Sequence, residues 1–199
     1  DHFLHPWTHF DSFRKDGSLV VAEGNDAYII DSRGKRYLDG IGSLWSMGIG
    51  YGRNEMADAI AEQVRRLPFF NTFRGTTHPR AIELSSALVE LMRPDGVAAL
   101  MFSNGGSDAV EGALKLARQY HKLRGDKDRF KFIALKQGYH GVHFGGMSVN
   151  GNSNFRRAYE PLLPGCHGQS RRYSAIAATT AGSTGTILCL PPLPVTRSA

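Results

Sequence analysis

The chain has 199 residues, of which 41% are hydrophobic and 21% charged, a composition typical of a soluble globular protein. No apolar run approaches the ~20 residues needed to cross a bilayer, and two cysteines are too few for a disulfide framework. The net charge of +6 does not indicate nucleic-acid binding, because basic residues are scattered among acids rather than clustered with aromatics. These features favour a cytoplasmic protein.

The N-terminal quarter of the chain is predicted to form an arm, a β meander and a loop. Residues 1–16 carry aromatics that favour docking on the core or on a partner. Residues 18–39 contain three strand-like runs separated by turn signals rich in glycine and aspartate. Residues 40–52 have no regular period, which favours a loop near a ligand or a second chain. Trp45 lies within this loop, and its residue type alone suits a place in the core.

Two amphipathic helices are predicted next, over residues 54–66 and 78–92. Pro68 ends the first, and His78 is expected to begin the second rather than to act as a base. The aromatic run between the helices includes Phe73, which either fills the core or lines a pocket.

Residues 99–121 are the stretch around which the chain is organised. Residues 100–102 suit a buried strand, the glycine pair at 105–106 breaks it, and a helix follows, capped by Asn104 or Ser107. Such a turn leaves free N–H groups at the positive end of the helix dipole, where a phosphate can bind. The same pattern also occurs as a plain structural turn.

A second strand is predicted over residues 130–135, which completes a strand–helix–strand unit and therefore a parallel sheet. Residues 138–141 (GYHG) follow this strand, at the edge where open α/β sheets bind ligands. Tyr139 is either a turn aromatic or a flat face for a ligand.

The segment that starts at Asn104, NGGSDAVEGALKLAR, resembles the phosphate-binding segment of class III aminotransferases, which use pyridoxal 5'-phosphate (PLP). Within that family, the sequence is most similar to the ω-amino acid–pyruvate transaminase branch. The resemblance places the cofactor phosphate on Gly106 and Ser107 and stacks Tyr139 on its pyridine ring. Glu111 is expected to give a supporting hydrogen bond near the cofactor.

The resemblance also implies the substrate site and the assembly. Trp45 and Phe73 are expected to line the substrate pocket, and Phe73 could reach the site of a partner subunit. The expected partners are an amine donor, a 2-oxo acid and a second copy of the chain as a homodimer, with no metal, nucleic acid or membrane.

The fold class implied is α/β, the N-terminal part of the type I, aspartate-aminotransferase-like fold of PLP-dependent transferases. It would comprise an incomplete parallel sheet with flanking helices and an N-terminal β meander. The expected division is an arm and small-domain meander over 1–52, a partial PLP-binding domain over 53–166, and an aberrant low-complexity tail over 167–199. The tail contrasts with the rest because no Asp or Glu follows Glu160.

Two parts of the family's catalytic machinery are not recognised in the sequence. In the family, the Schiff-base lysine and the aspartate on the pyridine nitrogen lie beyond the point where the resemblance stops, and neither Lys115 nor Lys136 is assigned that role. The chain is therefore expected to be truncated, to bind PLP weakly without a covalent bond, and to be inactive alone. The alternatives are a phosphate- or nucleotide-binding module and a fragment that only dimerises, although G-x-G-x-x-G and P-loop signatures are absent.

Overall fold

A computed structural model describes residues 2–169, which belong to two compact units. The N-terminal unit comprises Asp1–Phe70, and the C-terminal unit begins at Asn71. The first unit includes helix α3 (Asn54–Arg66), which the division expected from the sequence placed in the second domain. Each unit is described by itself.

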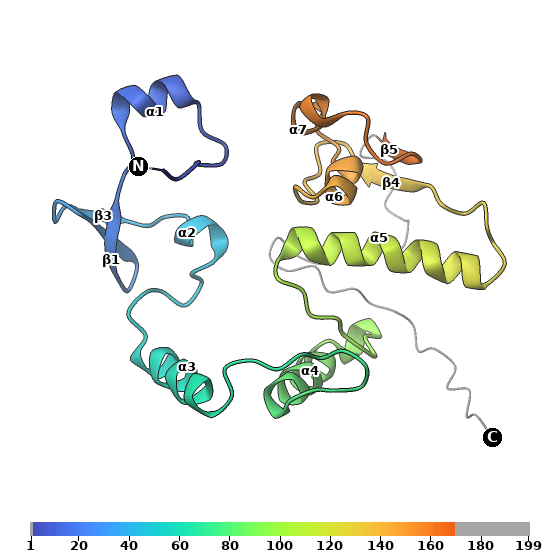
Figure 1. Cartoon of the computed structure of the whole chain (residues 1–199), viewed down its shortest axis with the longest axis horizontal. Helices are drawn as coiled ribbons and strands as arrows, with labels where there is room; N and C mark the ends of the chain where they lie inside the picture. The colour runs from blue at the N-terminus through green and yellow to red at the C-terminus, as the bar shows by residue number, and fades with distance from the viewer. Residues whose placement is uncertain (1, 170–199) are drawn as a thin grey trace. The chain divides into compact units, whose positions relative to one another are not determined.

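The N-terminal unit contains the predicted meander, preceded by helix α1 (Phe10–Asp16). Strands β1 (Val21–Asn25), β2 (Tyr28–Asp31) and β3 (Arg36–Leu38) form an antiparallel sheet in the order β1-β2-β3 (Figure 1). The meander expected from the turn signals is therefore confirmed.

Asp31 organises the turn between β2 and β3. Its Oδ1 accepts hydrogen bonds from the backbone N–H groups of Arg33 and Lys35, each at 2.9 Å, and its Oδ2 accepts one from the Tyr37 hydroxyl at 2.9 Å. The residue is only 8% exposed. The carboxylate satisfies donors that the tight turn would otherwise leave unpaired.

The glycine-rich loop contains one helical turn of the opposite hand to an α-helix, labelled α2 (Gly42–Trp45). The φ angles of Ser43, Leu44 and Trp45 are 47°, 59° and 68°. Left-handed turns of residues other than glycine are rare because Cβ approaches the following carbonyl oxygen. Asp39 supports the turn by accepting a hydrogen bond from Ser43 N–H at 2.7 Å.

Both predicted amphipathic helices are present, as α3 and as α4 (Pro79–Leu91), which the 3-10 turn η1 (Arg93–Asp95) follows. The interpretation of His78 as a helix-start residue is confirmed, because it is the N-cap of α4 and its ring nitrogen accepts a hydrogen bond from Ala81 N–H at 3.3 Å. Neither helix has a fully buried residue.

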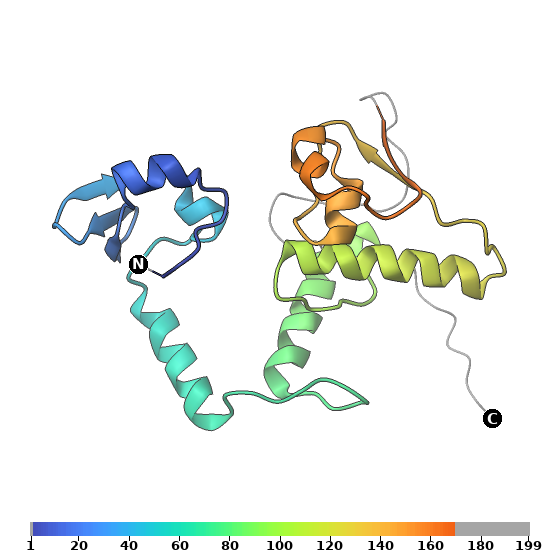
Figure 2. The same cartoon turned by 45° about the horizontal axis from the view of Figure 1, so that its top comes forward.

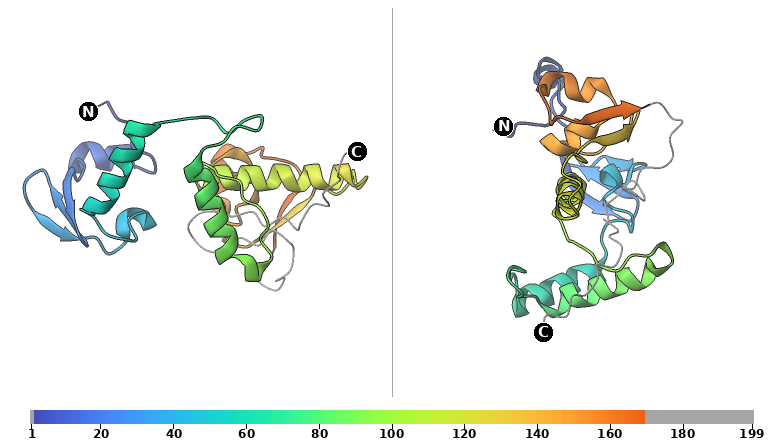
Figure 3. Two further views of the ribbon diagram at one scale, coloured as in Figure 1. Left: turned by 90° about the horizontal axis from the view of Figure 1, so that it is seen from below. Right: turned by 90° about the vertical axis from the view of Figure 1, so that its right-hand side faces the viewer.

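The C-terminal unit is built around helix α5 (Gly106–Leu123) and the parallel strand pair β4 (Phe132–Leu135) and β5 (Cys166–Gln169). Helix α6 (Phe144–Val149) contacts α5 and both strands (Figures 1 and 2). Figure 3 shows β4 and β5 side by side. The short helix α7 (Ser153–Arg156) and the 3-10 turn η2 (Arg157–Tyr159) link α6 to the chain that leads to β5.

The core of this unit lies where α5 meets α6. The buried residues of α5 are small, namely Ala109, Val110 and Ala113, and residues 145–149 of α6 are all buried. Small side chains allow the two backbones to approach closely, which keeps the loop before α6 near the start of α5.

Two local expectations for the stretch before α5 are wrong. Residues 100–102 are not a strand, because strand structure requires a hydrogen-bonded neighbour and the described part of the chain supplies none there. The helix cap is Gly105 rather than Asn104 or Ser107, and the Asp108 carboxylate instead accepts a hydrogen bond from Asn104 N–H at 3.2 Å.

The predicted tail is only partly visible, since residues 170–199 lie outside the described residues. Its first residues belong to β5, in parallel register with β4. In the described part of the chain, no helix has both the length and the apolar composition needed to cross a membrane.

Candidate active site

The start of α5 has open space around Gly105 and Gly106. The N–H groups of Gly106, Ser107 and Asp108 have no acceptor within the helix, since the first intrahelical bond runs from Ala109 N–H to Gly105 C=O at 3.0 Å. A Cβ built on Gly105 or Gly106 would meet no atom within 4 Å. The helix start therefore has room and donors for an anion, and the dipole of an 18-residue helix favours negative charge there.

The Ser107 hydroxyl is oriented by the loop that follows β4. Its Oγ accepts a hydrogen bond from the backbone N–H of Val142 at 3.1 Å. A hydroxyl that accepts one bond keeps its proton as a donor, and that proton is free to point toward a ligand oxygen. Gly141 lies directly against the same residue, because a Cβ on Gly141 would be 2.8 Å from the Ser107 Cα.

The structure thus brings together the two segments that the sequence singled out. Tyr139 lies two residues before Gly141 and its side chain is 56% exposed. The Tyr139 ring makes a T-shaped contact with the ring of Phe155 in α7, with ring centroids 5.8 Å apart and ring planes at 77°. This contact restricts the tyrosine ring on one side and leaves much of its surface accessible to a planar ligand.

Glu111 joins α5 to the start of α6. Its Oε1 accepts hydrogen bonds from the N–H of Gly145 at 2.5 Å and from the N–H of Gly146 at 3.0 Å. These amides belong to the first turn of α6, where a carboxylate compensates both the unpaired N–H groups and the helix dipole. The contact shows Glu111 as a tie within the scaffold, one turn along the helix from Ser107.

One residue that sequence reasoning missed is Asn150, whose side chain is almost fully buried, at 1% exposed. Its Oδ1 accepts a hydrogen bond from His140 N–H, and its Nδ2 donates one to Gly141 C=O at 2.9 Å. The only signal in the sequence is a polar residue that ends a run of small and apolar residues after the GYHG segment, which is too common to single out.

His140 sits beside Tyr139 in a partly buried environment. Burial lowers the pKa of its imidazole below the usual value of 6.5, because a charged ring would lose hydration. Its Nε2 is buried and has no hydrogen-bond partner among the described residues.

The two candidate pocket residues are both highly exposed in their own units. Trp45 belongs to the N-terminal unit and is 66% exposed, at the end of the left-handed turn. Phe73 is 78% exposed, in a loop closed by a hydrogen bond from Thr76 N–H to its carbonyl at 3.1 Å. Among the described residues no hydrogen bond or ring contact links Phe73 to Ser107 or Tyr139, so its pocket role stays a prediction.

Solved structures define the class of protein first. The chain is similar to an amine transaminase from an uncultivated Pseudomonas species, whose crystal structure is in the PLP-bound form, with a TM-score of 0.82 and 43% sequence identity. That match covers 85% of this chain and 38% of the transaminase. The described residues therefore have the type I fold of PLP-dependent transaminases, in part.

The family model for Aminotransferase class-III matches residues 12–185, which is most of the chain and includes part of the segment 167–199, expected from the sequence to be an aberrant tail. The chain belongs to the class III aminotransferases.

Relatives with assigned functions differ in their substrates. The chain is 37% identical over 163 residues to the adenosylmethionine-8-amino-7-oxononanoate aminotransferase of Methanocaldococcus jannaschii, covering 82% of this chain and 35% of the relative. It is 33% identical over 165 residues to the putrescine–pyruvate aminotransferase of Pseudomonas aeruginosa, covering 83% of this chain and 36% of the relative. The chain thus spans about a third of the length of these relatives.

Proposed function

We propose that this chain contributes the phosphate seat and the ring-facing aromatic of an aminotransferase that uses PLP. The proposed reaction transfers an amino group between an ω-amino compound and pyruvate or another 2-oxo acid. The observation that carries the proposal is the contact between Ser107, in the first turn of α5, and Gly141, two residues after Tyr139. One short span of the molecule thus joins donors for an anion to an accessible aromatic ring.

The residues present fit the cofactor in kind. The N–H groups of Gly106 and Ser107 and the Ser107 hydroxyl would bind the phosphate, as charge-assisted hydrogen bonds at a helix start. The ring of Tyr139 would limit the tilt of the cofactor ring. Glu111 would hold the start of α6, which follows the Tyr139 loop, against α5. When bound, PLP supplies an electron-accepting ring for amine chemistry, which protein side chains cannot supply.

The proposed substrates follow from the resemblance of the sequence to the ω-amino acid–pyruvate branch. An amine transaminase and a putrescine–pyruvate aminotransferase are also among the similar proteins. Trp45 and Phe73 are proposed as walls of the amine pocket, and a homodimer as the working assembly. The relative from Methanocaldococcus jannaschii instead has adenosylmethionine and 8-amino-7-oxononanoate in its name.

Binding experiments can test the proposed phosphate site at Gly106 and Ser107 without measuring enzyme turnover. PLP and pyridoxal, which lacks the phosphate, would be titrated into the full chain and followed by absorbance and by calorimetry. We expect PLP to bind more tightly, and Ser107→Ala to weaken PLP by about tenfold while leaving pyridoxal unchanged, because a hydrogen bond to a charged group is worth roughly 1.5–3 kcal/mol. Ser103→Ala, at an exposed serine just before the turn, is the matched control.

Equal affinity for PLP and pyridoxal would contradict the proposal. Preferential binding of ATP or NAD over PLP would favour a nucleotide-binding module instead. Binding of none of these compounds by a folded dimer would favour a fragment that only dimerises.

The same samples test the expectation that this chain holds PLP without a covalent bond. Lys115 and Lys136 are both exposed, and neither is assigned as the Schiff-base lysine from the sequence. After borohydride reduction, peptide mapping should therefore find no single modified lysine. One lysine modified in full would show that the chain carries its own attachment site.

A further inference from the structure

We propose that Asn150 is the residue that positions Tyr139, by fixing the backbone on which the tyrosine ring is mounted. This inference rests on the proposed function, because it concerns the face that Tyr139 presents to the cofactor ring. Nothing in the spacing of the sequence assigns Asn150 a role, and the assignment comes from its buried contacts.

Both peptide groups that flank the Tyr139 Cα are held by the pair Asn150–Gly151. The peptide before it is held through Gly138 C=O, which accepts a hydrogen bond from Gly151 N–H at 2.9 Å. The peptide after it is held through His140 N–H, which donates to Asn150 Oδ1. Because peptide groups are planar, restraining both sets φ and ψ of Tyr139 and so the direction of its Cα–Cβ bond.

The Asn150 amide has one orientation that satisfies both of its backbone partners. The acceptor must face His140 N–H and the donor must face Gly141 C=O, so the oxygen and the nitrogen are distinguished by chemistry. An ionised aspartate at this position would lack the donor, and leucine would lack both groups. The side chain also reaches the Met147 sulfur at 3.6 Å, which leaves little of the amide group unengaged.

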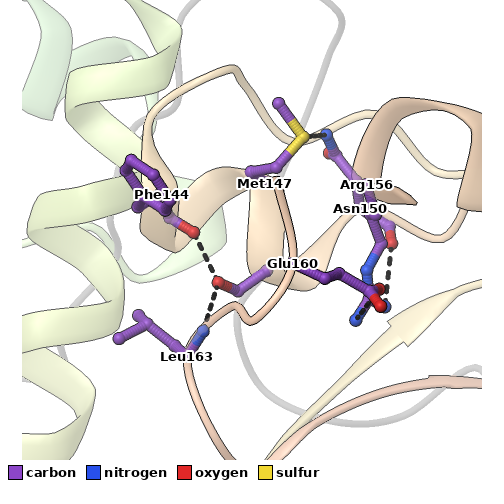
Figure 4. Close-up of polar contacts among 7 residues, drawn as sticks. Phe144, Met147, Asn150, Arg156, Glu160 and Leu163 are labelled. Carbon is purple, nitrogen blue, oxygen red and sulfur yellow. Dashed lines mark hydrogen bonds and ion pairs between the residues drawn. The ribbon is translucent and has the colours of Figure 1, made fainter. Parts of the chain in front are cut away.

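Asn150 is itself anchored through its own backbone. Its N–H donates a hydrogen bond to Met147 C=O at 3.2 Å. Its C=O accepts one from Arg156 Nη1 at 3.5 Å (Figure 4). Arg156 in turn pairs with the Glu160 carboxylate at 3.7 Å. Asn150, which holds the Tyr139 loop, is therefore itself held by residues of α6 and α7 rather than lying on a free loop.

A double-mutant cycle of Asn150 and Tyr139 distinguishes a role of Asn150 in positioning Tyr139 from a role in stability alone. Asn150→Asp keeps the acceptor for His140 N–H but replaces the donor to Gly141 C=O with an acceptor. Pyridoxamine 5'-phosphate is the probe, because it needs no covalent attachment. We expect Asn150→Asp to weaken its binding by about tenfold in the otherwise unchanged chain and by less than about twofold when Tyr139 is already leucine.

Asn152→Asp is the matched control, because Asn152 also accepts a backbone hydrogen bond, from Asn154 N–H at 2.9 Å, but at the start of α7. It should leave binding of the probe unchanged. Equal losses from Asn150→Asp in the Tyr139 and the Tyr139→Leu backgrounds would overturn the inference, as would no loss in either.

Two further results separate this inference from the proposed function. If the unsubstituted chain does not bind pyridoxamine 5'-phosphate, the proposed function fails, and the inference that rests on it fails too. If Asn150→Asp does not fold, as judged by circular dichroism, amide hydrogen exchange of the unsubstituted chain decides. A His140 amide that exchanges slowly supports the inference, and one that exchanges as fast as exposed amides overturns it.

Discussion

A methyl group placed on Gly141 would lie 2.8 Å from both the Cα and the Oγ of Ser107, so these two residues meet with no room for a side chain between them. The loop after β4 thereby rests on the first turn of α5, and Val142 N–H reinforces the contact through Ser107 Oγ at 3.1 Å. Any displacement of the loop that carries Tyr139 must also displace the Ser107 hydroxyl. The proposed phosphate site and the loop that carries Tyr139 are therefore in direct contact.

Gly141→Ala should disrupt that contact. The new Cβ would overlap Ser107, and the φ of Gly141, +108°, is one that residues with a side chain rarely adopt. We expect the free energy of unfolding to fall by about 2–4 kcal/mol, from backbone strain plus overpacking, as measured by urea unfolding followed by circular dichroism.

Gly125→Ala is the control for Gly141→Ala. Gly125 also has a positive φ, of +91°, but a Cβ there would meet nothing within 4 Å. It should show only the backbone cost, of about 1 kcal/mol. Equal effects of the two substitutions would mean that the contact with Ser107 carries no energy.

Glu111 should matter mainly as an acceptor for two amides. Glu111→Gln keeps a carbonyl oxygen that Gly145 and Gly146 can use, whereas Glu111→Ala leaves both N–H groups without a partner. We expect Glu111→Ala to lower the free energy of unfolding by about 2–3 kcal/mol and Glu111→Gln by about 1 kcal/mol. Thermal and urea denaturation would measure both.

Glu83→Gln is the comparison for Glu111. Glu83 pairs with Arg80 at 2.8 Å on an exposed face of α4, and exposed ion pairs contribute roughly 0–1 kcal/mol. If Glu111→Ala were no more costly than Glu83→Gln, the tie between α5 and α6 would be unimportant for stability.

His140 should make the fold less stable in mild acid. Its pKa is lowered from 6.5 by burial, so as the pH falls below 6.5 the unfolded chain takes up a proton before the folded chain does. Because the unfolded state then carries more protons, the free energy of unfolding decreases as the pH falls through that interval. Well above pH 6.5 the imidazole is neutral in both states, and stability no longer depends on it. Urea unfolding from about pH 8 to about pH 5 would measure the slope.

His140→Gln removes this titration and should give a shallower slope in the same interval. The carboxyls with lowered pKa values do not interfere: hydrogen bonds from Lys35 N–H and from the Tyr51 hydroxyl are the main causes for Asp31 and Asp39, respectively. Both titrate below their usual value of 3.8 and lose their contribution only in stronger acid. An unchanged slope in His140→Gln would show that another group is responsible.

Asp31→Asn should loosen the β2–β3 turn. The amide oxygen can replace one acceptor, but the carboxylate uses both oxygens, for Arg33 and Lys35 N–H and for the Tyr37 hydroxyl. We expect a loss of about 1–2 kcal/mol in unfolding free energy, since hydrogen bonds to charged groups exceed neutral ones. Asp58→Asn, on an exposed face of α3, should change little. Faster amide exchange confined to the turn would locate the effect.

Much of the fold was predictable because its signals are local. The period of α3 and α4, the proline after α3 and the glycine turns of the meander are properties of short stretches, and the helices and strands form there. The proximity of Ser107 and the GYHG loop was expected from a strand–helix–strand unit, of which the described residues form the helix α5 and the second strand β4 but not the first strand.

The remaining features depend on residues distant in the chain. Residues 100–102 have the composition of a strand, yet a strand needs a neighbour that the described residues do not provide. The proposed role of Asn150 depends on its side chain contacting His140 N–H and Gly141 C=O, ten and nine residues earlier in the chain, after α6 has folded between them. No spacing in the sequence encodes that meeting.

The reversed hand of the turn at Gly42–Trp45 restricts how the proposed amine pocket could be redesigned. Trp45 has a φ of 68°, a value that glycine adopts freely, asparagine tolerates, and valine or isoleucine resists through its branched Cβ. A saturation library at this position would be filtered by backbone geometry before substrate shape had any effect. Chemists who want a wider pocket should find functional glycine and asparagine variants more often than equally small β-branched ones.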